Sequence, residues 1–483
     1  METVNLSTGS GPQPAISPLL FGQFIEFIET CIDGGIYDPG NPRSDEAGIR
    51  EDVAQLCARL ASPILRYPGG TYITVHHWKD MIGPKARRPR TLNRVWGGVI
   101  DGGFGTAEFI QFCRRIGAEP MLCVNMASGT AEEAADWVEY CNGTADTHYA
   151  NLRRQHGYPE PFGVKYWCIG NECYAEPDIG VQHDVQRYIR DAWEFTKYMK
   201  LTDPDIRLVF VGSDDELWNR AVLDALSPVC DYFSLHTYAG EGGMGPYGPF
   251  RQLQDILAKT DRLAELVRSY PARVSGFSPW YRFPPRQEAI RLCLDEWNLW
   301  DPAPRPGDRY GLLTTYNWRD ALWTACFLIA LIRRCDAVGI ACMAQLVNVL
   351  APIVADDQGS HIQTTYYPLH YFRAHCGGRL LPWQSPSPTF DGGAAGQLEQ
   401  LHLCATAHDD GKVTLLAVNI GSQPLALALP HSGGVHIQLT APALDSANSR
   451  HSDVVCGAES AIESATVLLV PHSIHVLTLH GPV

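Results

Sequence analysis

The segment "KYWCIGNE", Lys165 to Glu172, passes directly from apolar residues into an amide and a carboxylate. A run of strand length that is apolar at successive positions, without alternation, is typical of a parallel strand buried on both faces. A carboxylate at the end of such a strand is costly to bury unless the protein uses it. The segment therefore predicts a buried parallel strand and makes Glu172 a candidate functional acid.

Seven further segments share this length and apolar texture. They cover residues 21–26, 63–68, 120–125, 206–212, 231–236, 291–296 and 339–345. Apolar residues at helical spacing lie between several of them, over residues 49–60, 106–116, 130–141 and 182–200. Strands that alternate with helices in this way predict an α/β fold, a (β/α)8 TIM barrel. A doubly wound open sheet is the alternative, but no Gly-rich phosphate loop follows the first strand.

The pattern changes after about Cys376. Strand-length runs are now separated by turn signals such as Asp409-Asp410-Gly411, and helical periodicity is absent. This texture predicts an all-β sandwich. We therefore predict three parts, which are residues 1–17 as an N-terminal segment joining the β-sandwich, residues 18–375 as the barrel, and residues 376–483 as the C-terminal β-sandwich.

The composition indicates a cytoplasmic protein. The chain has 483 residues, a formal net charge of −15 and a sequence pI of about 5.5, and such an acidic surface disfavours nucleic acid and anionic membranes as partners. The N-terminus lacks the basic and apolar regions of a secretory signal, and the longest apolar run, residues 321–332, is too short to span a bilayer and fits a buried helix. The 15 cysteines, an odd number scattered through apolar segments, are typical of reduced thiols.

Polar residues end seven of the eight predicted strands. They are Glu26, Arg66, Asn125, Asn171, Glu172, His236, Tyr238, Asp295, Glu296 and Gln345. In a TIM barrel the carboxyl ends of the strands form the active-site face, so we expect these side chains at one rim. No cluster has the spacing of a zinc site, so we expect no metal, and no Ser or Cys lies in a nucleophile elbow.

Two carboxylates among amides and aromatic rings are the groups that cleavage of a sugar bond requires. One carboxyl protonates the leaving oxygen and the other attacks the anomeric carbon, and in retaining enzymes the two lie about 5–5.5 Å apart. Glu172 and Glu296 are the candidates, because they end different strands of the predicted barrel. Asp295 is expected to point away from Glu296, since neighbours on a strand face opposite sides. Among the tryptophans, Trp297 and then Trp96 are favoured as sugar-stacking platforms.

Taken as a whole, the chain resembles the retaining α-L-arabinofuranosidases of glycoside hydrolase family 51, within the (β/α)8 glycosidase clan A. The matching segments run along nearly the whole chain, and their order and spacing make the resemblance specific. They include "FGQFIE", "LRYPGGTY", "FGTAEFIQFCRRIGAEPMLCVN", "KYWCIGNE", "DYFSLHTY", "LDEWNLW" and "AQLVNVLAPI".

The resemblance implies a role for each site residue. Glu172 matches the general acid/base, Glu296 the nucleophile, and Arg66 the residue that would hold the nucleophile ionised. The expected substrate-binding residues are Glu26, Arg66, Thr71, Asn171, His236, Tyr238, Trp297 and Gln345, although a lone His at a strand end is more often structural. The family's members are commonly intracellular hexamers without a cofactor. The expected activity is release of terminal α-L-arabinofuranosyl residues from small oligosaccharides by double displacement.

Three positions depart from the family pattern and leave the sugar specificity open. Phe27 replaces the usual His, Thr71 replaces Asn or Cys, and "CYAEPDIG" replaces a Gly-rich turn after Glu172. A β-xylosidase, another furanosidase or an endo-glucanase of clan A is the alternative enzyme. A sugar-binding protein without catalysis is the alternative outside enzymes, and the presence of both glutamates disfavours it.

Overall fold

The computed structural model describes residues 2–9, 11–176, 179–182, 184–302 and 307–481. Eight parallel strands form a closed barrel, and each of them coincides with a predicted strand, so the predicted barrel is confirmed. In chain order the strands are β3 (Gly22–Phe24), β4 (Ile64–Tyr67), β7 (Glu119–Val124), β8 (Tyr166–Ile169), β9 (Arg207–Phe210), β10 (Tyr232–Ala239), β11 (Arg291–Leu299) and β12 (Val338–Ala344).

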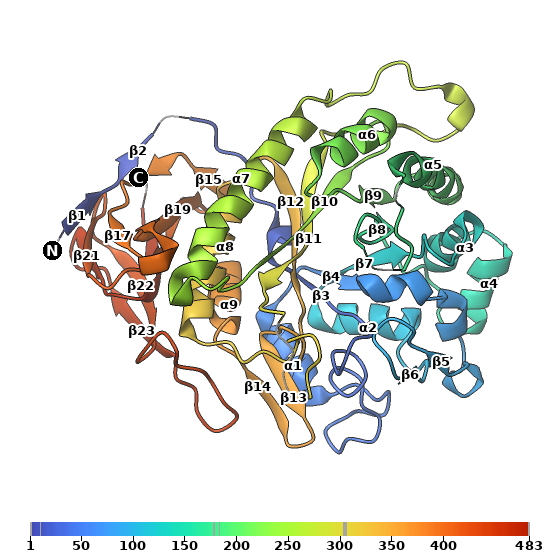
Figure 1. Cartoon of the computed structure of the whole chain (residues 1–483), viewed down its shortest axis with the longest axis horizontal. Coiled ribbons are helices and arrows are strands. Elements are labelled where there is room, and N and C mark those ends of the chain that lie inside the picture. The colour runs from blue at the N-terminus through green and yellow to red at the C-terminus, as the bar shows by residue number, and fades with distance from the viewer. Residues whose placement is uncertain (1, 10, 177–178, 183, 303–306, 482–483) are drawn as a thin grey trace.

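Helices surround the barrel (Figure 1). They are α1 (Glu51–Leu60), α2 (Thr106–Ile116), α3 (Ala131–Asn142), α4 (His148–Gln155), α5 (Val185–Thr202), α6 (Glu216–Leu226), α7 (Gly248–Arg268), α8 (Trp318–Ile332) and α9 (Tyr366–His375). The four predicted helices correspond to α1, α2, α3 and α5. Local sequence explains their ends, as in α2, where the Glu108 side chain accepts from the backbone N–H of Gly105 and Gly117 closes the helix at φ 76°.

The C-terminal region is a two-layer β-sandwich. One sheet contains β15 (Arg379–Leu381), β19 (Leu401–Ala407), β20 (Val413–Asn419), β25 (Ser473–Leu479), β22 (Gly434–Thr440) and β23 (Cys456–Ala461). The other contains β1 (Glu2–Asn5), β21 (Leu425–Ala428) and β24 (Thr466–Leu469), and the apolar core between them includes Val4, Leu415, Leu427, Leu469 and Leu477. β1 pairs in parallel with β21, which ties the start of the chain to its end. The limits of the parts at residues 17 and 375 stay a prediction.

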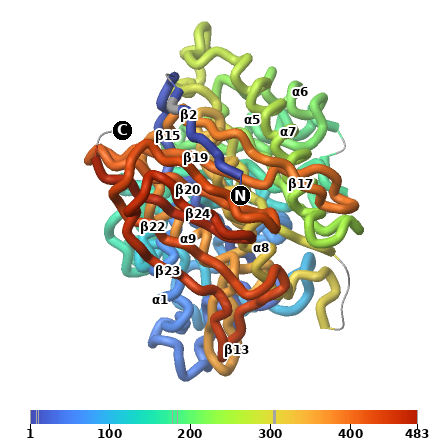
Figure 2. The backbone as a smooth tube through the Cα atoms, turned by 90° about the vertical axis from the view of Figure 1, so that its left-hand side faces the viewer, coloured from blue at the N-terminus to red at the C-terminus, as the bar shows by residue number. Residues whose placement is uncertain are grey.

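Short two-stranded antiparallel sheets complete the architecture. They are β2 (Ser7–Thr8) with β16 (Trp383–Gln384), β5 (Thr91–Leu92) with β6 (Val99–Ile100), β13 (Ile353–Asp356) with β14 (Gly359–Ile362), and β17 (Thr389–Asp391) with β18 (Gln397–Glu399). The sandwich lies at one side of the barrel in Figure 1, and Figure 2, turned by 90°, shows its strands from the front.

Helix α8 lies between the barrel and the sandwich. It contacts strands β19, β20 and β25 of the large sheet, and all but one of its 15 residues are buried. A helix that is buried on every side has apolar residues around its whole circumference, so its sequence is a continuous apolar run. This position explains the apolar run of residues 321–332. Among the helices of the described residues, none has the length and apolar character to cross a bilayer, and all fifteen cysteines are free thiols.

The barrel closes between β3 and β12, and a glycine makes that closure possible. A Cβ added at Gly22 would lie 2.5 Å from Ile64 Cγ2 and 2.7 Å from the Ala341 carbonyl oxygen. Both distances are shorter than van der Waals contact, and one of the neighbours is backbone. The strand therefore has no room for a side chain at this position.

We expect Gly22→Ala to lower the free energy of unfolding by about 1–3 kcal/mol, because overpacking a barrel strand forces its neighbours apart. Denaturant unfolding followed by tryptophan fluorescence measures the change. Gly40→Ala is the matched control, since a Cβ there meets nothing within 4 Å. Equal stability of the two variants would contradict this account of the closure.

Candidate active site

A buried guanidinium organises the rim formed by the carboxyl ends of the barrel strands. Arg66, on β4, is fully buried and donates from Nη1 to Glu296 Oε1 at 2.6 Å and from Nη2 to Asn171 Oδ1 at 2.7 Å. The Phe24 ring lies 4.7 Å from the guanidinium carbon. One side chain from β4 thus joins the loop after β8 to β11, and three predicted site residues meet.

Both oxygens of Glu296 are engaged. Oε1 accepts from Arg66, and Oε2 accepts from the Tyr238 hydroxyl at 2.7 Å. A Cβ added at Gly70 would come within 2.9 Å of Oε1, so only glycine permits this approach of the backbone. The Glu296 carboxylate is therefore fixed in orientation from two sides.

Glu172 is held opposite Glu296 by an unusual backbone. Gly170 has φ 84° and Glu172 itself has φ 39°, in the left-handed region that costs free energy for a residue with a side chain. Glu172 Oε1 and His236 Nδ1 lie 2.9 Å apart. Burial would raise the pKa of Glu172, but the hydrogen bond and charge of His236 outweigh it and lower that pKa. A Glu172 oxygen, a Glu296 oxygen and a His236 nitrogen all lie within 4.8 Å of one another.

The prediction that Asp295 points away from Glu296 is wrong. Asp295 is buried inside the barrel, where Oδ1 accepts from Ser234 Oγ at 2.5 Å and Oδ2 lies 3.4 Å from Arg66 Nε. The register of β11 shifts against β12 between Leu294 and Trp297. This irregularity breaks the alternation on which the prediction rested, so that two successive acids face the same interior.

A fourth acid, Glu26, follows β3 at the rim. Its Oε1 accepts from the backbone N–H of Tyr72 at 2.8 Å and from Trp96 Nε1 at 3.0 Å, and its Oε2 accepts from Gln345 Nε2 at 3.1 Å. Burial raises the pKa of Glu26 to about 7, against the opposing effect of these donors. Thr71 lies nearby, buried at the start of the 3-10 helix η2 (Thr71–Val75). These donors and acceptors form a polar cradle beside Glu296.

The prediction that Trp297 is a sugar-stacking platform is wrong. Its side chain is 0% exposed, and its ring stacks on Phe327 of α8 with centroids 4.6 Å apart. The indole therefore lies outside the barrel, between β11 and α8. Trp96 is the tryptophan at the rim, through its bond to Glu26. Asn125 is also outside the cluster, because its amide bonds the loop residues His76 and Ser128.

A pocket of about 560 Å³ opens beside Glu172. It is lined by Glu172, His236 and Tyr238 together with Tyr174 and Trp218. The sequence did not lead us to Tyr174 or Trp218. Tyr174 lies in the segment after Glu172 that departs from the family pattern, and this departure was the signal that could have pointed to it. Trp218 lies on α6, a helix that was not predicted.

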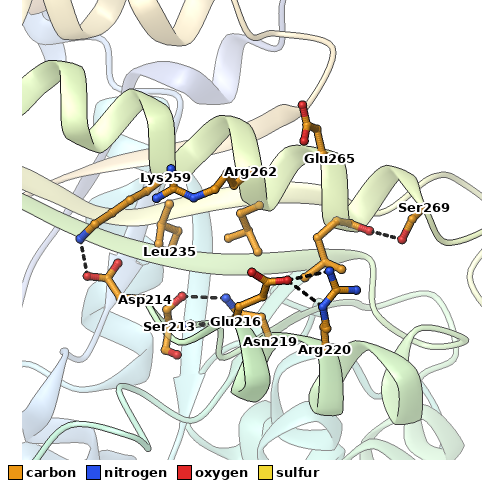
Figure 3. A pocket seen from close by; sticks show the side chains of 12 residues that line it. Ser213, Asp214, Glu216, Asn219, Arg220, Leu235, Lys259, Arg262, Glu265 and Ser269 are labelled. Atoms are coloured by element: carbon orange, nitrogen blue, oxygen red, sulfur yellow. Dashed lines mark hydrogen bonds and ion pairs between the residues drawn. The ribbon is translucent and has the colours of Figure 1, made fainter.

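A second hollow, of about 340 Å³, lies between α6 and α7 and shares Ser213, Asp214 and Lys259 with this pocket (Figure 3). Its floor includes Leu235, the outward-facing neighbour of His236 on β10, so it lies behind the barrel wall. Lys259 pairs with Asp214 at 2.5 Å and Arg220 with Glu216 at 2.6 Å. None of the predicted site residues lines this hollow.

Glu172, His236 and Glu296 also have the residue types of metal ligands. However, the Arg66 guanidinium lies 2.6 Å from a Glu296 oxygen, and its positive charge opposes a cation there. The same oxygens accept hydrogen bonds from protein donors. Within the described residues, the cluster therefore fits acid–base chemistry better than metal binding.

Comparisons with known proteins agree with this site. The "Alpha-L-arabinofuranosidase 1 domain" family model matches residues 56–253, and the "Alpha-L-arabinofuranosidase C-terminal domain" model matches residues 295–473. The chain is 36% identical over 429 residues to "Alpha-L-arabinofuranosidase C" of Emericella nidulans, which covers 84% of this chain and 82% of that protein.

A bacterial relative and a solved structure extend the comparison. The chain is 35% identical over 421 residues to the "Intracellular exo-alpha-(1->5)-L-arabinofuranosidase" of Halalkalibacterium halodurans, with coverage of 84% and 82%. The structure of the α-L-arabinofuranosidase from Thermotoga maritima in complex with arabinose superposes with a TM-score of 0.88. It is 31% identical, and the match covers 99% of this chain and 100% of that one.

We expect Trp297→Phe to leave the KM for a 4-nitrophenyl glycoside unchanged and to lower the free energy of unfolding by about 1–2 kcal/mol, because the ring fills the core and its Nε1 has no hydrogen-bond partner. Trp96→Phe is the comparison, and loss of its bond to Glu26 should raise KM about tenfold. Steady-state kinetics and thermal unfolding measure both effects. A larger KM change in Trp297→Phe than in Trp96→Phe would contradict the assignment.

Proposed function

Since the chain belongs to the α-L-arabinofuranosidase family, we propose that it is a retaining exo-glycosidase that releases terminal α-L-arabinofuranosyl residues from arabino-oligosaccharides by double displacement. The separation of the two carboxylates carries the proposal. Oxygens of Glu172 and Glu296 lie within 4.8 Å of one another. This spacing suits direct attack by one carboxylate, whereas inverting enzymes need about 6.5–9.5 Å to admit a water.

The contacts around the two acids support their roles. Glu296 is the nucleophile, because Arg66 and Tyr238 orient both of its oxygens toward a common position. Glu172 is the general acid and base, because it borders the open pocket on the side where a leaving group would depart. Attack by Glu296 on the anomeric carbon forms a glycosyl-enzyme ester, while Glu172 protonates the leaving oxygen. Glu172 then deprotonates a water molecule, which attacks the anomeric carbon of the ester and releases the sugar.

The polar cradle is the binding site for the terminal sugar. Glu26 and Asn171 offer oxygens to sugar hydroxyls, and Gln345 and Trp96 orient Glu26. Arg66, Thr71, His236 and Tyr238 complete the set of proposed substrate-binding residues. The leaving group extends toward Tyr174 and Trp218, which offer aromatic faces to a second sugar. No contact in the described residues favours a xyloside or glucan over an arabinofuranoside.

We expect Glu296→Ala to abolish turnover of 4-nitrophenyl α-L-arabinofuranoside. Glu172→Ala should slow hydrolysis of an arabino-oligosaccharide about 10²–10⁴-fold, with much less effect on a dinitrophenyl glycoside whose leaving group needs no proton. Azide should rescue Glu172→Ala and give a product of retained configuration. Steady-state kinetics and NMR of the products measure these outcomes.

Glu216→Ala is the matched control, because Glu216 is an exposed residue of α6 paired only with Arg220. Its turnover should equal that of the parent. Wild-type turnover in both Glu172→Ala and Glu296→Ala would end the assignment. Activity on xylosides or cellulose alone, with none on arabinofuranosides, would select the alternative enzyme, and binding without product would select the non-catalytic protein.

We also propose that the protein is a cytoplasmic homo-oligomer, a hexamer as the family resemblance implies. The bacterial relative is described as intracellular, and the fifteen cysteines are free. Multi-angle light scattering should give a particle of six times the 53.4 kDa chain mass. A monomer mass across the concentration range would reject the oligomer and leave the catalytic assignment standing.

A further inference from the structure

Asp295 is an acid inside the barrel to which the proposed reaction assigns no step. Its Oδ2 lies 3.4 Å from Arg66 Nε and 3.5 Å from His236 Nε2, and its Oδ1 accepts from Ser234 Oγ. Arg66 Nε has no hydrogen-bond partner among the described residues, and it forms an ion pair with Asp295. The Asp295 carboxylate therefore lies between two basic side chains. One is Arg66, which contacts Glu296, and the other is His236, which contacts Glu172.

His236 has a carboxylate at each ring nitrogen. Nε2 faces Asp295, whereas Nδ1 faces Glu172 at 2.9 Å and Glu296 at 3.5 Å. A neutral imidazole can donate from only one nitrogen, but an imidazolium donates from both. The geometry therefore favours the charged ring. The groups around it are Glu172 from the loop after β8, Asp295 and Glu296 from β11, Arg66 from β4 and the Tyr238 hydroxyl from β10.

Electrostatics agrees with the geometry. Burial would lower the pKa of His236, but Glu296 and Asp295 outweigh it and raise that pKa well above its usual value. Burial would likewise raise the pKa of Asp295, yet the charges of His236 and Arg66 lower it to about 2. The two groups thus stabilise each other's ionised form.

We infer that Asp295 is a positioning residue that keeps His236 charged, so that the Glu172–His236 pair holds the proton which the leaving group receives. This inference rests on the proposed function. In the first half-reaction the pair gives one proton to the leaving oxygen, a Glu296 oxygen bonds to the anomeric carbon, and the electron pair of the broken C–O bond leaves with that oxygen. In the second half-reaction water returns one proton to the pair, its oxygen bonds to the anomeric carbon, and the ester electron pair returns to Glu296.

Asp295 has its largest effect in the glycosyl-enzyme intermediate. Esterification removes the charge of Glu296, which until then lies beside both Arg66 and His236. Asp295 keeps its charge and is then the remaining buried counter-ion in contact with both cations. It therefore preserves the affinity of the pair for the proton that water must give up.

Asp295→Asn tests this inference, because it removes the charge and keeps the shape. Loss of a negative charge lowers the affinity of the pair for its proton, so the basic limb of the kcat/KM profile should move to lower pH by about one unit or more. The substrate is 4-nitrophenyl α-L-arabinofuranoside. Ser234→Ala is the matched control, since it removes the other hydrogen bond of Asp295 and leaves the charge, and its basic limb should stay in place.

A uniform loss of kcat/KM in Asp295→Asn, with the basic limb unmoved, would show a packing role and overturn the inference. If the variant does not fold, NMR of the parent enzyme labelled with ¹⁵N-histidine decides, with His236→Gln giving the assignment. Two protonated ring nitrogens at neutral pH are expected, and a neutral ring would overturn the inference. A parent that does not hydrolyse the arabinofuranoside rejects the proposed function, whereas the NMR result still tests Asp295 and His236.

Discussion

The ion pairing of one buried arginine holds the site together. Arg66 is completely removed from water, and a buried guanidinium without partners would cost several kcal/mol. Glu296 and Asp295 on β11 and Asn171 after β8 supply those partners. Three strands on different sides of the barrel are thereby tied to a single charge. Moving one of these strands would weaken the pairing of a buried ion, so the geometry of the proposed catalytic acids is coupled to the closure of the barrel.

Acidic and basic side chains contact one another inside the rim. Glu172, Asp295 and Glu296 surround His236 and Arg66, so three acids face two cationic groups at hydrogen-bonding or near hydrogen-bonding distance. Within such a cluster the protonation state of one residue depends on its neighbours. The left-handed backbone of Glu172 fits this design, because local strain is tolerated where surrounding structure fixes the residue.

The sandwich contributes a wall behind the barrel. Helix α8 packs against β11 of the barrel and against the large sheet, and its buried Phe327 stacks on Trp297, the residue directly after Glu296. The strand that carries Glu296, the proposed nucleophile, is thus backed by a helix covered on both sides. Dense packing of this kind has low compressibility and leaves the strand little room to move, which suits a carboxylate that must keep its distance from a partner acid.

The sequence by itself determined the eight strands, because each is an apolar run that only burial on both faces explains. It also singled out Glu172 and Glu296 as candidate catalytic acids, because acids at the ends of such runs are costly to bury without a use. Tertiary structure decided the direction of Asp295, the burial of Trp297 and the place of Tyr174. Side-chain direction on a strand follows from alternation only while the register is regular, and β11 shifts its register beside the site. The neighbours of a residue across a closed barrel depend on contacts hundreds of positions apart, which no local pattern records.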